Sequence, residues 1–211
     1  MDILEDFLDK YDSLIIFLRF SRREIFDKVP ENFLLWEVKN ADPIRYDKYH
    51  EQVIHSSVIL GFSYLENFLQ EVIRRYYIRF PQALPQNRQI KYQEILAATS
   101  FEEIKEELIN REINELFYKG IAEILEFLRT AWGYSIKDDV IKTIEEASLV
   151  RNCIIHNQSI VDRKLSIKFS YEKGSKLQLA EEYVHAAGIT IRDFVESIFA
   201  QSKQKGIDCS L

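Results

Sequence analysis

The chain has 211 residues, of which 46% are hydrophobic and 13% aromatic, and it carries a formal net charge of −6. This composition is sufficient for one large buried core, while the excess of acids argues against a general affinity for nucleic acid, which depends on clusters of Lys and Arg. The longest near-continuous apolar run, from Leu14 to Leu18, is far below the roughly 20 residues that span a bilayer, and the opening "MDILEDFLDK" has no basic signal region, so we expect a cytoplasmic protein without a membrane partner.

The spacing of apolar residues predicts five helices. A first helix follows the capping residue Asp2 and runs to about Leu18, and Pro30 and Pro43 interrupt the connection over residues 21–48. A long second helix is expected over residues 49–80. The other helices are expected near residues 100–132, where Gly120 can divide the helix, near residues 137–156 and near residues 180–203.

Between the last two helices the hydrophobic period changes to two. In "KLSIKFSYEKGSKLQL", Leu165, Ile167, Phe169 and Tyr171 alternate with polar residues, and Gly174 is expected in a turn. The predicted fold is therefore an all-α bundle of about five helices with a small β-hairpin before the last helix. We expect an N-terminal helix and extension over residues 1–48, the bundle over residues 49–203 and a flexible tail over residues 204–211.

The two cysteines, Cys153 and Cys209, are too few for a disulfide framework and lack the spacing of a zinc site. The carboxylates of residues 102–126 are dispersed as on a solvated helix face. We predict reduced thiols, no metal and no cofactor.

The fourth predicted helix has an arginine on its apolar face. At about 100° per residue, Arg151 falls near the middle of the arc that holds Ile144, Ala147 and Ile154. A guanidinium in a bundle core is costly unless it is paired and hydrogen-bonded, so Arg151 requires a partner. A supporting carboxylate on another helix, such as Glu66 in "SYLENFL", would satisfy it, and Arg151 could then serve only to complete a buried ion pair.

Polar residues continue from Arg151 to the end of the same helix. Asn152 and His156, four apart, lie on one side of the helix, so the amide can orient the imidazole. Asn157 is suited either to ending the helix or to binding a ligand there.

The stretch "RNCIIHN", residues 151–157, resembles the signature of the HEPN superfamily: an Arg, a polar residue that is often Asn, a few mostly apolar positions, and a His at the end of a bundle helix. Arg151, Asn152 and His156 match this pattern position by position. The resemblance implies a HEPN-like helical bundle, and many HEPN proteins are metal-independent endoribonucleases that act as toxins or antiviral defence effectors. The HEPN toxins that are silenced by nucleotidylation have a Tyr two positions after the His, whereas this chain has Gln158, so we do not expect that control here.

The catalytic roles that the resemblance implies suit these residues chemically. Attack of a ribose 2′-OH on the adjacent phosphorus requires a base, an acid and positive charge near the transition state. His156 can exchange a proton at neutral pH, and Arg151 can hold the phosphate with two donors. One histidine cannot readily do both proton transfers, and His50, His55 and His185 are poor local candidates. We therefore predict a homodimer that places two copies of His156 around one RNA-binding cleft and leaves a 2′,3′-cyclic phosphate.

Two stretches, residues 71–91 and 151–176, contain more bases than acids, whereas acids predominate in residues 93–150. Both basic stretches are predicted to contact RNA, with Arg163, Lys164 and Lys168 as substrate-binding residues of the second, unless the charges are sorted by chance on a solvated surface. The aromatic residues of these stretches could stack on bases, although such residues more often belong to a core; they are Tyr76, Tyr77, Phe169 and Tyr171.

Two other functions remain open from the sequence. The first is a HEPN-like module that binds a nucleotide, RNA or a protein without cleavage. The second is a helical interaction protein in which Arg151 has a purely structural role. Beyond RNA and a second copy of the chain, the expected partners are an antitoxin or another component of a defence system.

Overall fold

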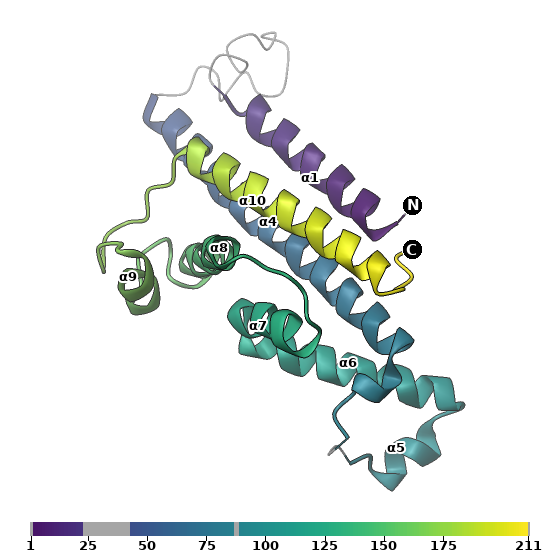
Figure 1. The fold of residues 1–211 in the computed structure, drawn as a ribbon. Coiled ribbons are helices and arrows are strands. Elements are labelled where there is room, and N and C mark those ends of the chain that lie inside the picture. The colour runs from purple at the N-terminus through teal and green to yellow at the C-terminus, as the bar shows by residue number, and fades with distance from the viewer. Residues whose placement is uncertain (1, 23–42, 87–88, 211) are drawn as a thin grey trace.

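The computed structural model describes residues 2–22, 43–86 and 89–210. Three long helices, α1 (Ile3–Phe20), α4 (Pro43–Arg79) and α10 (Glu181–Gln204), lie side by side (Figure 1). Helices α6 (Phe101–Lys119) and α8 (Asp138–His156) also pack against α4, and α7 (Ile121–Ala131) packs against both of them. Three short elements complete the described part: the 3₁₀ helix η1 (Pro81–Ala83), α5 (Tyr92–Ala97) and α9 (Arg163–Phe169).

The all-α class is confirmed, but the predicted β-hairpin is wrong. Across the described ranges there is no strand, only the two isolated bridges Asp2–Ser210 and Ile160–Lys176. Residues 163–169, expected to form the first strand, are α9. Gly174 does lie in a turn, with φ of +83°.

A capping carboxylate explains why this segment is helical. The Asp162 side chain accepts a hydrogen bond from the backbone N–H of Leu165 at 2.8 Å, which satisfies one of the unpaired donors at the start of a helix. The alternating residues then separate: Leu165 and Phe169, four apart, pack into the core, while Ile167 is 71% exposed. Ser170, with φ of +59°, ends the helix.

The predicted helix boundaries differ from the structure at α4 and α5. α4 begins at Pro43, inside the segment predicted as a connection, because proline is accepted in the first turn of a helix where its missing N–H has no intrahelical partner. Residues 23–42, the rest of that connection with Pro30, lie outside the described residues. The short α5 was not predicted. The region after Ser100 does divide at Gly120, whose φ of +97° is accessible to glycine at little cost.

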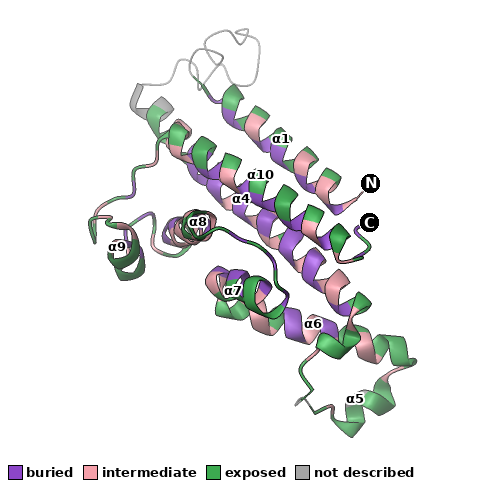
Figure 2. Ribbon diagram, viewed as in Figure 1, coloured by how far each residue is buried: buried purple, intermediate pink, exposed green. Residues whose placement is uncertain are grey.

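Two hydrophobic clusters hold the helices together (Figure 2). The larger one joins α1, α4, α6, α7, α10 and the first half of α8, and the buried face of α1 enters it through Ile3, Phe7 and Tyr11. The smaller one lies under the end of α8, where Val150 and Cys153 are fully buried against residues of α4, α9 and the segment that follows α9. This smaller cluster fixes which side of the last turns of α8 faces outward.

The C-terminal residues differ from the flexible tail that we predicted. Ile207 and Cys209 are buried in the larger cluster, and the backbone N–H of Ile3 donates to the carbonyl of Cys209 at 3.1 Å. Both cysteines are free thiols, and burial raises the pKa of each. No helix within the described ranges is long and apolar enough to cross a membrane.

Candidate functional site

The last turns of α8 display the polar residues of the "RNCIIHN" stretch. The helix ends where the N–H of Asn157 donates to the carbonyl of Cys153 at 3.1 Å. Gln158 and Ser159 then adopt left-handed conformations, with φ of +53° and +62°. Since a left-handed helical turn is costly for L-residues, this pair stops α8 and redirects the chain toward α9.

Arg151 is held between α4 and its own helix. Its Nη2 lies 3.5 Å from Oε2 of Glu66, its Nη1 donates to Oδ1 of Asn152 at 3.1 Å, and its guanidinium lies 5.9 Å from the centre of the Phe62 ring. The buried Nε has no hydrogen-bond partner among the described residues. The side chain of Arg151 as a whole is still 24% exposed.

Glu66 is the carboxylate that we proposed as a partner for Arg151, and the structure brings the two together. Burial raises the pKa of Glu66, and the charge of Arg151 opposes that rise. Arg151 lies at the edge of the buried face of α8 rather than in its centre, because Val150 and Cys153 carry that face toward the smaller cluster.

His156 is exposed on the last turn of α8, and the described contacts do not join it to Arg151 or Asn152. The Asn152 amide bonds to Arg151 rather than to the imidazole, which differs from the orienting contact that we expected. His156 does lie on the side of the helix that also displays Glu145, Leu149 and Asn152, because residues three and four apart share a face.

That side of α8 forms one wall of a groove of about 670 Å³. The opposite walls come from the junction of α6 and α7 and from α9. Three predicted substrate-binding residues, Arg163, Lys164 and Lys168, line the groove together with Asn152, and Lys119 adds a fourth basic side chain. Asn152 therefore links the Arg151 guanidinium to a basic groove, whereas Arg151, His156 and Asn157 do not line it.

The charge of the groove is largely unneutralised. Lys168 pairs with Glu145 at 3.1 Å, but Arg163, Lys164 and Lys119 have no ion-pair partner in the described part of the chain. The end of α6 and the start of α7 meet at Gly120 in the same wall, so the opposite dipole ends of these two helices lie together there and the positive charge comes from the side chains. An anion in the groove would thus meet several cationic groups at once.

The described residues of the other basic stretch, 71–86 and 89–91, do not form a comparable surface. Arg75 pairs with Glu71 at 2.8 Å and donates to the carbonyl of Asp208, and Arg74 lies 3.8 Å from the same glutamate. Tyr76 stacks on the Trp132 ring with a centroid distance of 3.5 Å. Arg88 lies outside the described residues.

The aromatic residues that we considered as base platforms pack inside the protein instead. Tyr77 is buried, Phe169 and Tyr171 pack on the smaller cluster, and the Tyr171 hydroxyl donates to Glu146 at 2.8 Å. Burial is the main cause of the raised pKa of both tyrosines, with that of Tyr77 reaching about 12.

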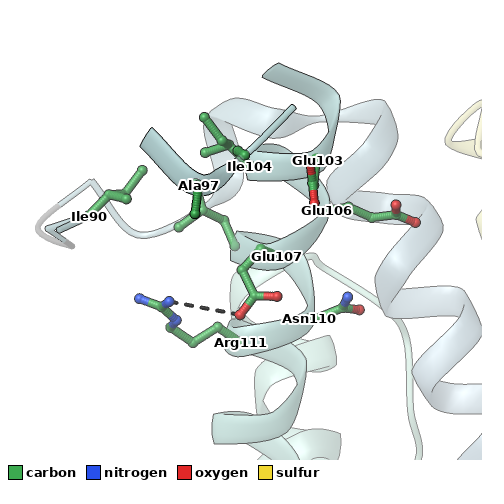
Figure 3. A pocket seen from close by; sticks show the side chains of 10 residues that line it. Ile90, Ala97, Glu103, Ile104, Glu106, Glu107, Asn110 and Arg111 are labelled. Carbon is green, nitrogen blue, oxygen red and sulfur yellow. Dashed lines mark ion pairs between the residues drawn. The ribbon is translucent and has the colours of Figure 1, made fainter. Parts of the chain in front are cut away.

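A second hollow, of about 380 Å³, lies between α5 and the first half of α6 (Figure 3). Its polar lining is mainly acidic, with Glu103, Glu106 and Glu107 (Figure 3). Two hydrogen bonds from Thr99 lower the pKa of Glu103, and Glu107 pairs with Arg111 at 3.9 Å. Within the described residues, no three His, Cys, Asp or Glu side chains are grouped to hold a metal ion. This hollow would repel a phosphate.

The other histidines occupy different surroundings from His156. His55 is 4% exposed, and its Nδ1 lies 3.4 Å from the hydroxyl of Ser159, just after the motif. Burial lowers the pKa of His55. His185 is exposed on α10, beside α1.

Lys119 and the start of α7 are part of the groove, although the sequence alone does not predict this. The only local signal there was the helix break at Gly120, and nothing in the sequence indicated that this break lies beside α8.

No family model matches the chain, and neither a curated protein nor a solved structure matches it.

Proposed function

We propose that this protein is a metal-independent endoribonuclease that cleaves RNA to a 2′,3′-cyclic phosphate, and that it acts as a toxin or antiviral defence effector. The observation that supports the proposal most is the end of α8. There the Arg151 guanidinium, fixed by Glu66, bonds to Asn152 in the wall of a basic groove, and His156 is exposed on the same side of the helix as that wall.

In the proposed reaction the ribose 2′-oxygen attacks the adjacent phosphorus and loses its proton to a base. The bond from phosphorus to the 5′-oxygen breaks, and an acid gives that oxygen a proton. His156 supplies one of these transfers, and the Arg151 guanidinium stabilises the added negative charge on the phosphate.

The second proton transfer requires another group, and His55 and His185 are poorly placed for it. His55 is buried, and His185 lies on α10. A homodimer that brings in the His156 of a second copy would complete the pair. If so, mixing His156→Ala subunits with the wild type should lower cleavage below the level expected from dilution, because mixed dimers contain only one imidazole.

The test is end-group analysis of RNA incubated with the purified protein in the presence of EDTA. We expect 2′,3′-cyclic phosphate ends, and we expect His156→Ala to lower the rate by at least about a hundredfold. His185→Ala removes an exposed histidine elsewhere on the surface and is the matched control. Equal cleavage by the wild type and His156→Ala would refute the proposal.

A non-catalytic binding module is the second candidate. One observation favours it: the Arg151 guanidinium already contacts Glu66 and Asn152, so it need not act on a substrate. Stoichiometric binding of RNA or a nucleotide, with no turnover and no effect of His156→Ala on binding, would support this function.

A further inference from the structure

The groove between α7, α8 and α9 combines two kinds of surface. Basic side chains come from α6 and α9, and the apolar residues Ile121, Leu149 and Ile167 also line the groove. Ile167 is the clearest case, since it is 71% exposed and has no packing role that would explain an isoleucine at this position. The groove has a volume of about 670 Å³, which is typical of clefts that bind small molecules or short polymer segments.

The combination of basic and apolar side chains favours single-stranded over double-stranded nucleic acid. A duplex presents phosphates and sugars to a protein surface and keeps the faces of its bases stacked inside. A single strand presents phosphates and unstacked base faces together, and proteins that bind it pair a basic groove with aromatic side chains on which bases stack. In this groove the apolar surface for a base is aliphatic. Apolar residues in the groove would add little to the binding of a duplex.

We propose that the groove binds a single-stranded segment of nucleic acid next to the motif at the end of α8, with phosphates on Arg163, Lys164 and Lys119 and a base over Ile167. Its identification as RNA rests on the proposed function. The segment would run along the wall of α8 toward Asn152 and His156, which lie on the same side of that helix.

Basic side chains without an ion-pair partner explain why nucleic acid should bind in this groove rather than elsewhere on an acidic protein. Arg163, Lys164 and Lys119 have no ion-pair partner among the described residues, whereas Lys10 of α1 pairs with Asp6 and Lys176 pairs with Glu51. Each phosphate neutralised by a protein cation releases counterions, so binding to this groove should weaken with salt.

The experiment measures the binding of a fluorescein-labelled 2′-O-methyl RNA, which 2′-OH chemistry cannot cleave, in single-stranded form and annealed to its complement. Arg163→Glu/Lys164→Glu should weaken single-strand binding by at least about tenfold at moderate salt and reduce its salt dependence. The matched control is Lys10→Glu/Arg19→Glu, which reverses one Lys and one Arg on α1, away from α9 (Figure 1). The control should bind as the wild type does.

A second pair of variants tests the apolar surface. Ile167→Ser should weaken binding of the single strand by about fivefold and leave duplex binding unchanged, because it removes apolar area that only a base would cover. Ile189→Ser, an exposed isoleucine on α10 that is 52% accessible, is the control. Circular dichroism should show the same helix content in all four variants.

The outcomes separate this proposal from the nuclease. If the groove variants bind the single strand as tightly as their controls, the inference is wrong, even where the wild type cleaves RNA. If the groove variants lose single-strand binding but His156→Ala does not alter cleavage, the groove is confirmed as a binding site and the nuclease proposal is wrong. Tighter binding of the duplex than of the single strand would overturn the inference. Failure of the protein to bind any oligonucleotide would also overturn it and would indicate that the groove binds a protein.

Discussion

The contact between Arg151 and Glu66 allows a quantitative prediction about stability. Two unit charges 3.5 Å apart, as these are, interact by about 1 kcal/mol in water and by about 5 kcal/mol at an effective dielectric constant of about 20. The side chains are 24% and 29% exposed, so solvent screens the pair partly. We expect Arg151→Met to lower the free energy of unfolding by about 2 kcal/mol at neutral pH, between the values for surface and buried pairs.

The pH dependence of this loss follows from Glu66. Burial raises the pKa of Glu66 and Arg151 lowers it, so Arg151→Met should raise the pKa further. A carboxyl whose pKa is higher in the folded state favours folding at low pH, and that stability is lost as the pH rises through the folded-state pKa. The cost of Arg151→Met should therefore be greatest at neutral pH and decrease on acidification, as Glu66 becomes protonated.

Urea denaturation followed by circular dichroism measures both effects. A double-mutant cycle with Glu66→Gln should give a coupling of about 1–2 kcal/mol, because the two side chains contact each other. Arg192→Met provides a control, since Arg192 is 45% exposed and pairs with two exposed carboxylates, Glu196 in its own helix and Asp12 of α1; it should cost less than about 1 kcal/mol. A loss for Arg151→Met no larger than that of Arg192→Met, and independent of pH, would refute the reasoning.

Three further predictions concern residues around the motif and the packing of α10. Burial lowers the pKa of His55, so the folded state favours the neutral imidazole, and the free energy of unfolding should fall as the pH drops below the ordinary pKa of 6.5. Urea denaturation at several pH values should show a shallower fall for His55→Phe. Gln158 has φ of +53°, so Gln158→Gly should raise the free energy of unfolding by about 0.5–1 kcal/mol, whereas Gln158→Ala should not. Thermal unfolding measures this difference. A Cβ at Gly188 would lie 2.2 Å from the Tyr11 hydroxyl, so Gly188→Ala should cost about 1–3 kcal/mol in urea denaturation, and adding Tyr11→Phe should recover part of it.

The helices of this protein could be predicted where the local pattern and the packing agree. Asp2 caps α1 through its contacts with the N–H groups of Leu4 and Glu5, and the expected apolar face from Ile3 to Leu18 is the buried one. A partner for Arg151 was also predictable, because a buried charge requires one, although the choice of Glu66 depended on how α4 and α8 pack.

Other features depended on tertiary contacts that no local pattern contains. The wheel of α8 placed Arg151 in the centre of its apolar face, but the smaller cluster draws Val150 and Cys153 inward and moves Arg151 to the edge. At this edge the Arg151 side chain is 24% exposed, whereas a residue in the centre of the face would be buried.

The mistaken hairpin has a functional consequence. In an extended strand Arg163 and Lys164 would point to opposite faces, since successive side chains alternate. In α9, Lys164 and Lys168 are four apart, as are Arg163 and Ile167, so the helix places three basic residues and an exposed isoleucine together in the wall of the groove. The Asp162 cap that makes this segment helical therefore also determines which surface it presents to α8. The basic groove is thus a product of the local fold of α9 rather than of charge composition alone. In the described part of residues 71–91, by contrast, Arg74 and Arg75 lie beside Glu71.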